Sequence, residues 1–127
     1  MTYKILIVDD SKLARMAVNK VLRALYPGWT PLEAANVDEA LKCMKESSPH
    51  IALLDFNMPG RDGLDLAAEL RRTNPSMPVA VISANRQQEV LDRARLAGAA
   101  FLPKPLTEAE LGEFLQAAVQ TLSGGAV

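Results

Sequence analysis

Short apolar runs alternate with helix-periodic segments along the whole chain, and this alternation constrains the fold most. Solidly apolar runs occupy residues 5–8, 51–54, 79–82 and 100–102, and a weaker strand candidate covers residues 29–35. Such short runs, apolar on both faces, are typical of strands buried inside a parallel sheet. The intervening segments repeat apolar residues at helical spacing.

Five strand–helix units predict an α/β fold with helices on both faces of a parallel sheet. Pro31 lies in the weaker second strand and cannot donate a ladder hydrogen bond, so that strand belongs at an edge. The first strand is apolar throughout and belongs inside. These features favour a doubly wound, flavodoxin-like sheet of five strands in the order 2-1-3-4-5, with five helices.

Helix boundaries are marked by capping residues. Ser11 can cap the first helix, and residues 36–39 resemble a capping pair for the second. Gly98 suits a left-handed cap after the fourth helix, and residues 107–110 form a capping box for the last.

Length and composition exclude several classes of protein. A chain of 127 residues has room for one domain, expected over residues 1–122, followed by a flexible tail at 123–127. The net charge of −1 argues against a broad nucleic-acid-binding face. No apolar run is long enough for a membrane span.

Cysteine and histidine are each present once. Cys43 cannot form an internal disulfide, which fits a reducing cytosol and predicts a cytoplasmic protein. His50 alone excludes a multi-histidine metal site, makes a histidine-based triad unexpected, and is expected at the surface. Arg86, Arg93 and Arg95 are expected on a solvated helix face.

Polar residues follow the strands. Asp9 and Asp10 come after the first, Asp55 after the third, Ser83 after the fourth and Lys104 after the fifth. In an open α/β sheet, ligands bind beyond the carboxyl ends of the strands at the switch point, which here lies between strands one and three. We therefore expect three carboxylates to converge in one crevice, with a hydroxyl and an ammonium beside them.

Three close carboxylates need a cation, and Mg²⁺ suits oxygen ligands and completes its shell with water and phosphate oxygens. Protonated Lys104 cannot bind a metal but can pair with a carboxylate or a phosphoryl oxygen. The chain contains no Gly-rich phosphate-binding motif, so a nucleotide is not the expected ligand. Phosphoryl chemistry with an aspartate as covalent nucleophile remains.

Four segments resemble the receiver domain of two-component response regulators, in particular the single-domain chemotaxis and sporulation types. They are Val8–Ser11, Leu54–Gly63, Ile82–Ala84 and Gly98–Pro105. Each alone is a weak signal, but their order and spacing fit the five-strand pattern and make the resemblance specific.

The resemblance implies a role for each site residue. Asp55 would be the phosphoacceptor and a Mg²⁺ ligand, and Asp10 would bind Mg²⁺ directly. Asp9 would act through a metal-bound water, and the backbone carbonyl of Asn57 would complete the protein's ligands. Lys104 would hold a phosphoryl oxygen.

The resemblance also implies a switch. Ser83 would move toward the phosphoryl group, and Phe101 would turn inward with it. Asn57 and Asn85 would tune the phosphoryl lifetime, and a cis bond would precede Pro105. The output surface would be the fourth helix, fifth strand and fifth helix.

By the same resemblance the chain is a signalling domain rather than an enzyme, apart from its own phosphorylation and dephosphorylation. Its partners would be a histidine kinase or phosphotransfer protein and a downstream effector protein, with no direct nucleic-acid contact. It would be a monomer or a phosphorylation-linked dimer, and it could be excised from a longer regulator or hybrid kinase. A degenerate receiver acting as a phosphorylation-independent interaction module is the alternative. A haloacid-dehalogenase-type phosphohydrolase is disfavoured, because its D-x-D-x-[TV] motif does not occur.

Overall fold

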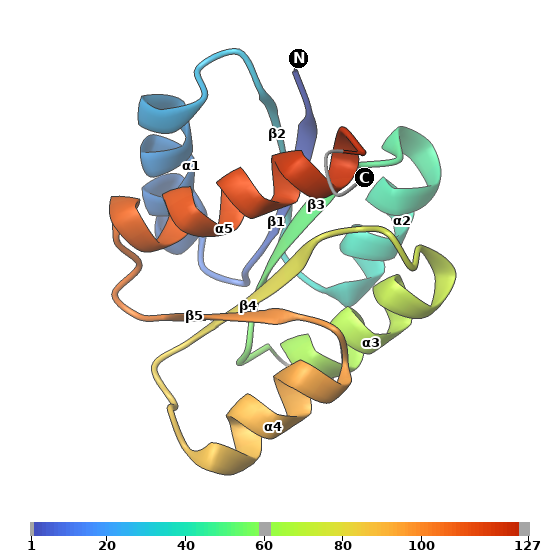
Figure 1. The fold of residues 1–127 in the computed structure, drawn as a ribbon, viewed down its shortest axis with the longest axis vertical. Coiled ribbons are helices and arrows are strands. Elements are labelled where there is room, and N and C mark those ends of the chain that lie inside the picture. Colours follow the sequence, from blue (N-terminus) through green and yellow to red (C-terminus); the bar gives the residue numbers. More distant parts are fainter. Residues whose placement is uncertain (1, 59–61, 125–127) are drawn as a thin grey trace.

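Five parallel strands form one sheet in the order β2-β1-β3-β4-β5 in the computed structural model, which describes residues 2–58 and 62–124 (Figure 1). The strands are β1 (Lys4–Val8), β2 (Thr30–Ala34), β3 (Ile51–Asp55), β4 (Val79–Ser83) and β5 (Ala100–Pro103). The helices are α1 (Lys12–Leu25), α2 (Val37–Ser47), α3 (Gly63–Thr73), α4 (Gln88–Leu96) and α5 (Glu108–Leu122). The predicted fold class and strand order are confirmed. Residues 59–61 of the predicted loop motif and 125–127 of the predicted tail lie outside the described residues.

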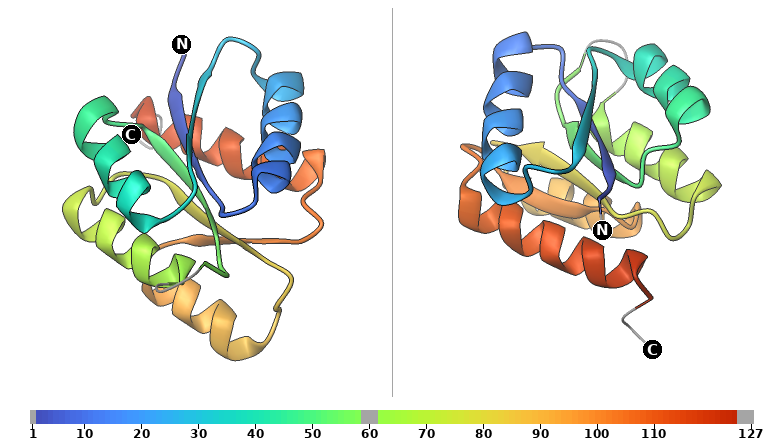
Figure 2. Two further views of the ribbon diagram at one scale, coloured as in Figure 1. Left: turned by 180° about the vertical axis from the view of Figure 1, so that it is seen from behind. Right: turned by 90° about the horizontal axis from the view of Figure 1, so that it is seen from above.

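Helices cover both faces of the sheet (Figure 2). On one face, Leu6 and Val8 of β1 pack in a cluster with apolar residues of α2, α3 and α4. On the other face, Ile5 and Ile7 of the same strand pack with residues of α1 and α5. Alternate side chains of a strand point to opposite faces, so a strand covered on both sides must be apolar at every position.

The edge position of β2 agrees with its sequence. Pro31 pairs in register with Ile5 of β1, and β1 is the neighbour of β2 in the sheet. Pro31 is half-buried, whereas all five residues of the internal strand β3 are buried. The exclusion of proline from internal strands therefore predicted this edge correctly.

The predicted helix caps are present. Ser11 Oγ accepts a hydrogen bond from the backbone of Ala14, and the Asn36 side chain accepts one of 2.8 Å from Glu39 N. Thr107 Oγ1 accepts a 3.1 Å bond from Glu110 N, and Gly98 has the expected positive φ of 73°. None of the helices within residues 2–58 and 62–124 is long and apolar enough to cross a membrane.

Strand register places the polar residues of the strand ends together. Val8 of β1 is level with Leu54 of β3, so the residue after β1 stands beside Asp55. Asp55 is level with Ile82 of β4, and Ser83 is level with Pro103 of β5. The pairing thus aligns the carboxyl ends of β1, β3, β4 and β5 at one edge of the sheet.

Candidate functional site at the carboxyl ends of the strands

Three carboxylates converge where β1 and β3 end. One oxygen from each of Asp9, Asp10 and Asp55 lies within 4.8 Å of the other two. Asp9 and Asp55 are buried, with 7% and 5% of their surfaces exposed, whereas Asp10 is open to solvent. The predicted convergence of these acids is therefore observed.

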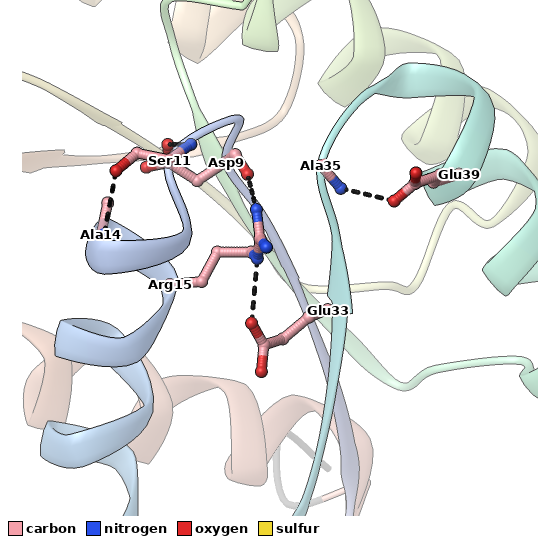
Figure 3. A network of polar contacts seen from close by, with 7 residues as sticks. All are labelled: Asp9, Ser11, Ala14, Arg15, Glu33, Ala35 and Glu39. Carbon is pink, nitrogen blue, oxygen red and sulfur yellow. Dashed lines mark hydrogen bonds and ion pairs between the residues drawn. The ribbon is translucent and has the colours of Figure 1, made fainter.

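The Asp9 carboxylate is held by the backbone that follows it. Its Oδ1 accepts a 2.9 Å hydrogen bond from Ser11 N, at the start of α1 (Figure 3). Burial raises the pKa of Asp9 above its ordinary value of 3.8, and the charges of Asp55 and Asp10 act in the same direction. The hydrogen bond from Ser11 and the charge of Lys104 lower it, and the net direction is upward. Negative charge at this carboxylate is thus only partly compensated by the protein.

Lys104 forms an ion pair with Asp55, at 2.7 Å between Nζ and Oδ1. Its backbone N–H donates a 3.0 Å hydrogen bond to the carbonyl of Ser83, which anchors the lysine to the end of β4. The peptide bond between Lys104 and Pro105 is cis, as expected.

The backbone around Asp55 is tightly enclosed. Phe56 N donates a 3.0 Å hydrogen bond to Ile82 O of the neighbouring strand β4. Gly63 N donates one of 2.9 Å to Phe56 O, which brings the start of α3 back to the end of β3. A Cβ atom on Gly63 would lie 2.2 Å from the Asp55 carbonyl oxygen, so only glycine fits there. Gly63 ends the predicted segment Leu54–Gly63, but its close approach to the Asp55 backbone was not predicted; its place directly after the helix cap Asp62 was a visible signal.

The expected switch residues lie on β4 and β5. Ser83 is buried, and its Oγ accepts a 2.9 Å hydrogen bond from Asn85 N. Accepting this bond does not use the hydroxyl hydrogen of Ser83. Phe101 is half-buried against the apolar cluster that includes α3 and α4. Asn57 and Asn85 are exposed in the loops that follow β3 and β4.

Two residues expected at the surface also make specific contacts. The Arg93 side chain is 40% exposed, and its Nη2 lies 3.1 Å from Asp62 Oδ2, so it joins α4 to the N-terminus of α3. His50 is half-buried, and its Nδ1 accepts a 3.0 Å hydrogen bond from Lys4 N. Both contacts join residues far apart in the chain, which sequence periodicity does not reveal.

The arrangement fits a hard divalent cation. Oxygen donors in a cluster, two of them shielded and one open to water, are the ligands that Mg²⁺ takes while keeping part of its water shell. The upward pKa shift of Asp9 indicates that a further positive charge would stabilise the ionised cluster. The one positive charge of Lys104 is too little to neutralise three carboxylates.

Comparison with known proteins assigns the family. The family model described as response regulator receiver domain matches residues 5–116. The chemotaxis protein CheY of Thermotoga maritima is 34% identical over 117 residues, which cover 91% of this chain and 96% of that protein. The chain belongs to the receiver-domain family of two-component response regulators.

Other relatives are longer, and solved structures agree with the fold. The glycerol metabolism activator of Pseudomonas putida is 35% identical over 124 residues, 96% of this chain but 55% of that protein. The chain thus spans about half the length of several relatives that it matches. Vibrio cholerae CheY4 has a TM-score of 0.82 at 26% identity, covering 93% of this chain and 99% of that one. A CheY-like receiver domain from Methanospirillum hungatei has a TM-score of 0.86 at 23% identity, covering 98% and 99%.

Proposed function

We propose that this chain accepts a phosphoryl group on Asp55 in a Mg²⁺-dependent reaction and signals the change to a partner protein. The observation that carries the proposal is the surroundings of one buried carboxylate. Asp55 lies within 4.8 Å of two further acids and is paired with Lys104 at 2.7 Å. Membership of the receiver family supports the same chemistry.

The resemblance to receiver domains implies a phosphohistidine donor on a histidine kinase or phosphotransfer protein. That histidine would belong to the partner, because the one histidine of this chain, His50, lies before β3 and away from the acids. A carboxylate oxygen of Asp55 attacks the phosphorus, a P–O bond forms, and the P–N bond breaks with its electron pair returning to the imidazole. The transition state is loose, so the protein contributes mainly positioning and charge stabilisation. Lys104, which pairs with Asp55, would bind a phosphoryl oxygen on it.

Asp10, Asp55 and the backbone carbonyl of Asn57 would hold Mg²⁺, with Asp9 acting through a bound water. When bound, the ion supplies charge neutralisation for the ionised acids and the incoming phosphoryl group. The chain's own contribution is to keep Asp55 shielded and its neighbours fixed. The exposed position of Asn57 and Asn85 gives them access to the water that would end the phosphorylated state.

Phosphorylation would act on Ser83 and Phe101. The phosphoryl group adds charge and acceptor oxygens, to which Ser83 can donate its hydroxyl hydrogen. Moving a two-state element from about 1:99 to 99:1 needs about 5.5 kcal/mol. A few charge-assisted hydrogen bonds, each contributing about 1.5–3 kcal/mol, could together supply this free energy. Phe101 would then turn inward and alter the surface formed by α4, β5 and α5, which an effector protein reads.

We propose residues 1–122 as the receiver unit, a boundary that the end of α5 at Leu122 supports. It works in the cytoplasm, which its single cysteine suits. It acts through proteins rather than nucleic acid, as a monomer or a phosphorylation-linked dimer.

Intact mass spectrometry after incubation with acetyl phosphate tests the proposal. We expect one phosphoryl adduct that requires Mg²⁺ and disappears in Asp55→Asn. An adduct that is unchanged in this variant, or no adduct at all, would contradict it. Partner binding that is independent of Mg²⁺ and survives Asp55→Asn would favour the interaction-module alternative.

A further inference from the structure

Arg15, one turn into α1, lies between the acidic site and the edge strand β2 (Figure 3). Its Nη1 donates a 2.6 Å hydrogen bond to the backbone carbonyl of Asp9, and its Nε donates one of 2.9 Å to Glu33 Oε1. We propose that Arg15 is a positioning residue for the cation site, because it fixes the part of the backbone that carries the Asp9 carboxylate. This inference rests on the proposed Mg²⁺-dependent function.

Asp9 is the first residue beyond β1, and its polar groups are held from three sides. Its N–H still reaches the sheet, with a 3.1 Å bond to Ala34 O on β2. Its carboxylate accepts the bond from Ser11 N at the start of α1. Its carbonyl has left the strand ladder and is bound by Arg15 instead. Together these bonds restrict rotation of the residue about both sides of its Cα atom.

Glu33 keeps the arginine in place. Its carboxylate comes from β2, whereas Arg15 comes from α1, so the pair joins the edge strand to the helix beside the acids. The Arg15 side chain is only 14% exposed, which is low for a residue type that usually stays in water. The guanidinium meets the carbonyl of Asp9 rather than its carboxylate, so its influence on a bound cation is exerted through position.

The two-acceptor geometry requires arginine. A guanidinium presents rigidly spaced N–H donors and can bind the Asp9 carbonyl and Glu33 at once, whereas a lysine ammonium is a point charge on a flexible stem. Arg15→Lys therefore keeps the charge and removes the two-point hold. Arg23→Lys is the matched control, since Arg23 is exposed near the far end of the same helix.

Calorimetric titration with MgCl₂ tests the inference on the wild type, Arg15→Lys, Glu33→Ala and Arg23→Lys. Loss of a residue that orients a metal ligand typically weakens metal binding about 10-fold or more. We expect Arg15→Lys to raise the Mg²⁺ Kd about 10-fold, Glu33→Ala to raise it by a smaller factor, and Arg23→Lys to leave it unchanged. Glu33→Ala does not change α1. Its Mg²⁺ Kd therefore still tests whether Arg15 positions the cation site if Arg15→Lys does not fold.

Amide hydrogen exchange without Mg²⁺ supplies a second readout. In Arg15→Lys, we expect Ser11 N–H to lose protection while the amides of β3 keep theirs. An unchanged Kd in both Arg15→Lys and Glu33→Ala, with the wild type binding Mg²⁺, would overturn this inference and leave the proposed function standing. A wild type that binds no Mg²⁺ would overturn both. A lower Tm with unchanged Kd and unchanged Ser11 exchange would mean that Arg15 only stabilises the fold.

Discussion

Lys104 and Asp55 form an ion pair across two strands that are not neighbours, because β4 lies between β3 and β5. The side chain of Asp55 is 6% exposed and that of Lys104 is 39% exposed, so the pair has a shielded acceptor and a donor that reaches solvent. The pair therefore meets solvent mainly through the lysine. The pair also offsets part of the repulsion among the three acids.

Removal of this cation should affect both stability and reactivity. We expect Lys104→Ala to lower the free energy of unfolding by about 1 kcal/mol, near the upper end for a partly exposed ion pair. It should also slow phosphoryl uptake from acetyl phosphate strongly. Urea unfolding and intact mass measure the two effects, with Lys20→Ala, an exposed lysine of α1, as the control. Equal uptake by both variants would contradict the role of Lys104.

Asp9 should make stability depend on pH. Because its pKa is raised in the folded state, the folded protein binds this proton more tightly than the unfolded chain does. The resulting stabilisation is complete below the ordinary pKa of 3.8 and is lost as the pH rises through the folded value.

Asp9→Asn removes this dependence and retains an oxygen for Ser11 N. We expect the variant to be more stable than the wild type at neutral pH and to lose that advantage at about pH 3. Mg²⁺ should reduce the difference at neutral pH, since it stabilises the ionised wild type. Urea titrations at the two pH values measure it. A stability difference between Asp9→Asn and the wild type that is the same at the two pH values would contradict a raised pKa of Asp9.

Replacement of glycine by alanine should change the free energy of unfolding in opposite directions at Gly63 and Gly112. Gly63→Ala places a Cβ against the Asp55 carbonyl and should lower the free energy of unfolding by about 2 kcal/mol. Gly112→Ala, inside α5, meets Leu25 at an ordinary 3.8 Å and should raise it by about 1 kcal/mol. Thermal unfolding of the two variants compares them directly. Destabilisation by Gly112→Ala, or tolerance of Gly63→Ala, would argue against this packing.

Asp62 combines a helix cap with an ion pair, and two substitutions separate them. Its Oδ1 accepts a 2.9 Å bond from Asp65 N, while Oδ2 faces Arg93. Asp62→Asn keeps the cap and loses the ion pair, so it should resemble Arg93→Ala, with a loss below about 1 kcal/mol. Asp62→Ala should cost about 1 kcal/mol more, because the cap is also lost. Equal stabilities for Asp62→Asn and Asp62→Ala would show that the cap contributes nothing.

The sequence predicted the parts of this site that follow from strand order. Apolar runs located the strands, Pro31 identified the edge, and parallel pairing brought Asp9 and Asp55 together. Strand positions, the edge strand and the pairing follow from two properties of each residue: whether it can donate a ladder hydrogen bond and whether its side chain can be buried. Local capping was predicted for the same reason, as at Ser11, because the partners lie within one turn of each other.

Contacts between side chains of different elements were not predictable. Arg15 reaches Glu33 across 18 positions, and Arg93 reaches Asp62 across 31. A charged residue on a helix is compatible with solvent or with a partner, and only the packing angles of helix and sheet decide between them. The role of Gly63 likewise depends on the return of the loop after β3 to the Asp55 backbone.

Chemical trapping can establish which residue is the phosphoacceptor. An acyl phosphate on aspartate is reduced by borohydride to homoserine, so treatment after incubation with Mg²⁺ and acetyl phosphate marks the modified residue for peptide mass spectrometry. We predict homoserine at position 55 and unmodified Asp9 and Asp10. Homoserine at either of those two positions, or at none, would contradict the assignment of Asp55 as the phosphoacceptor.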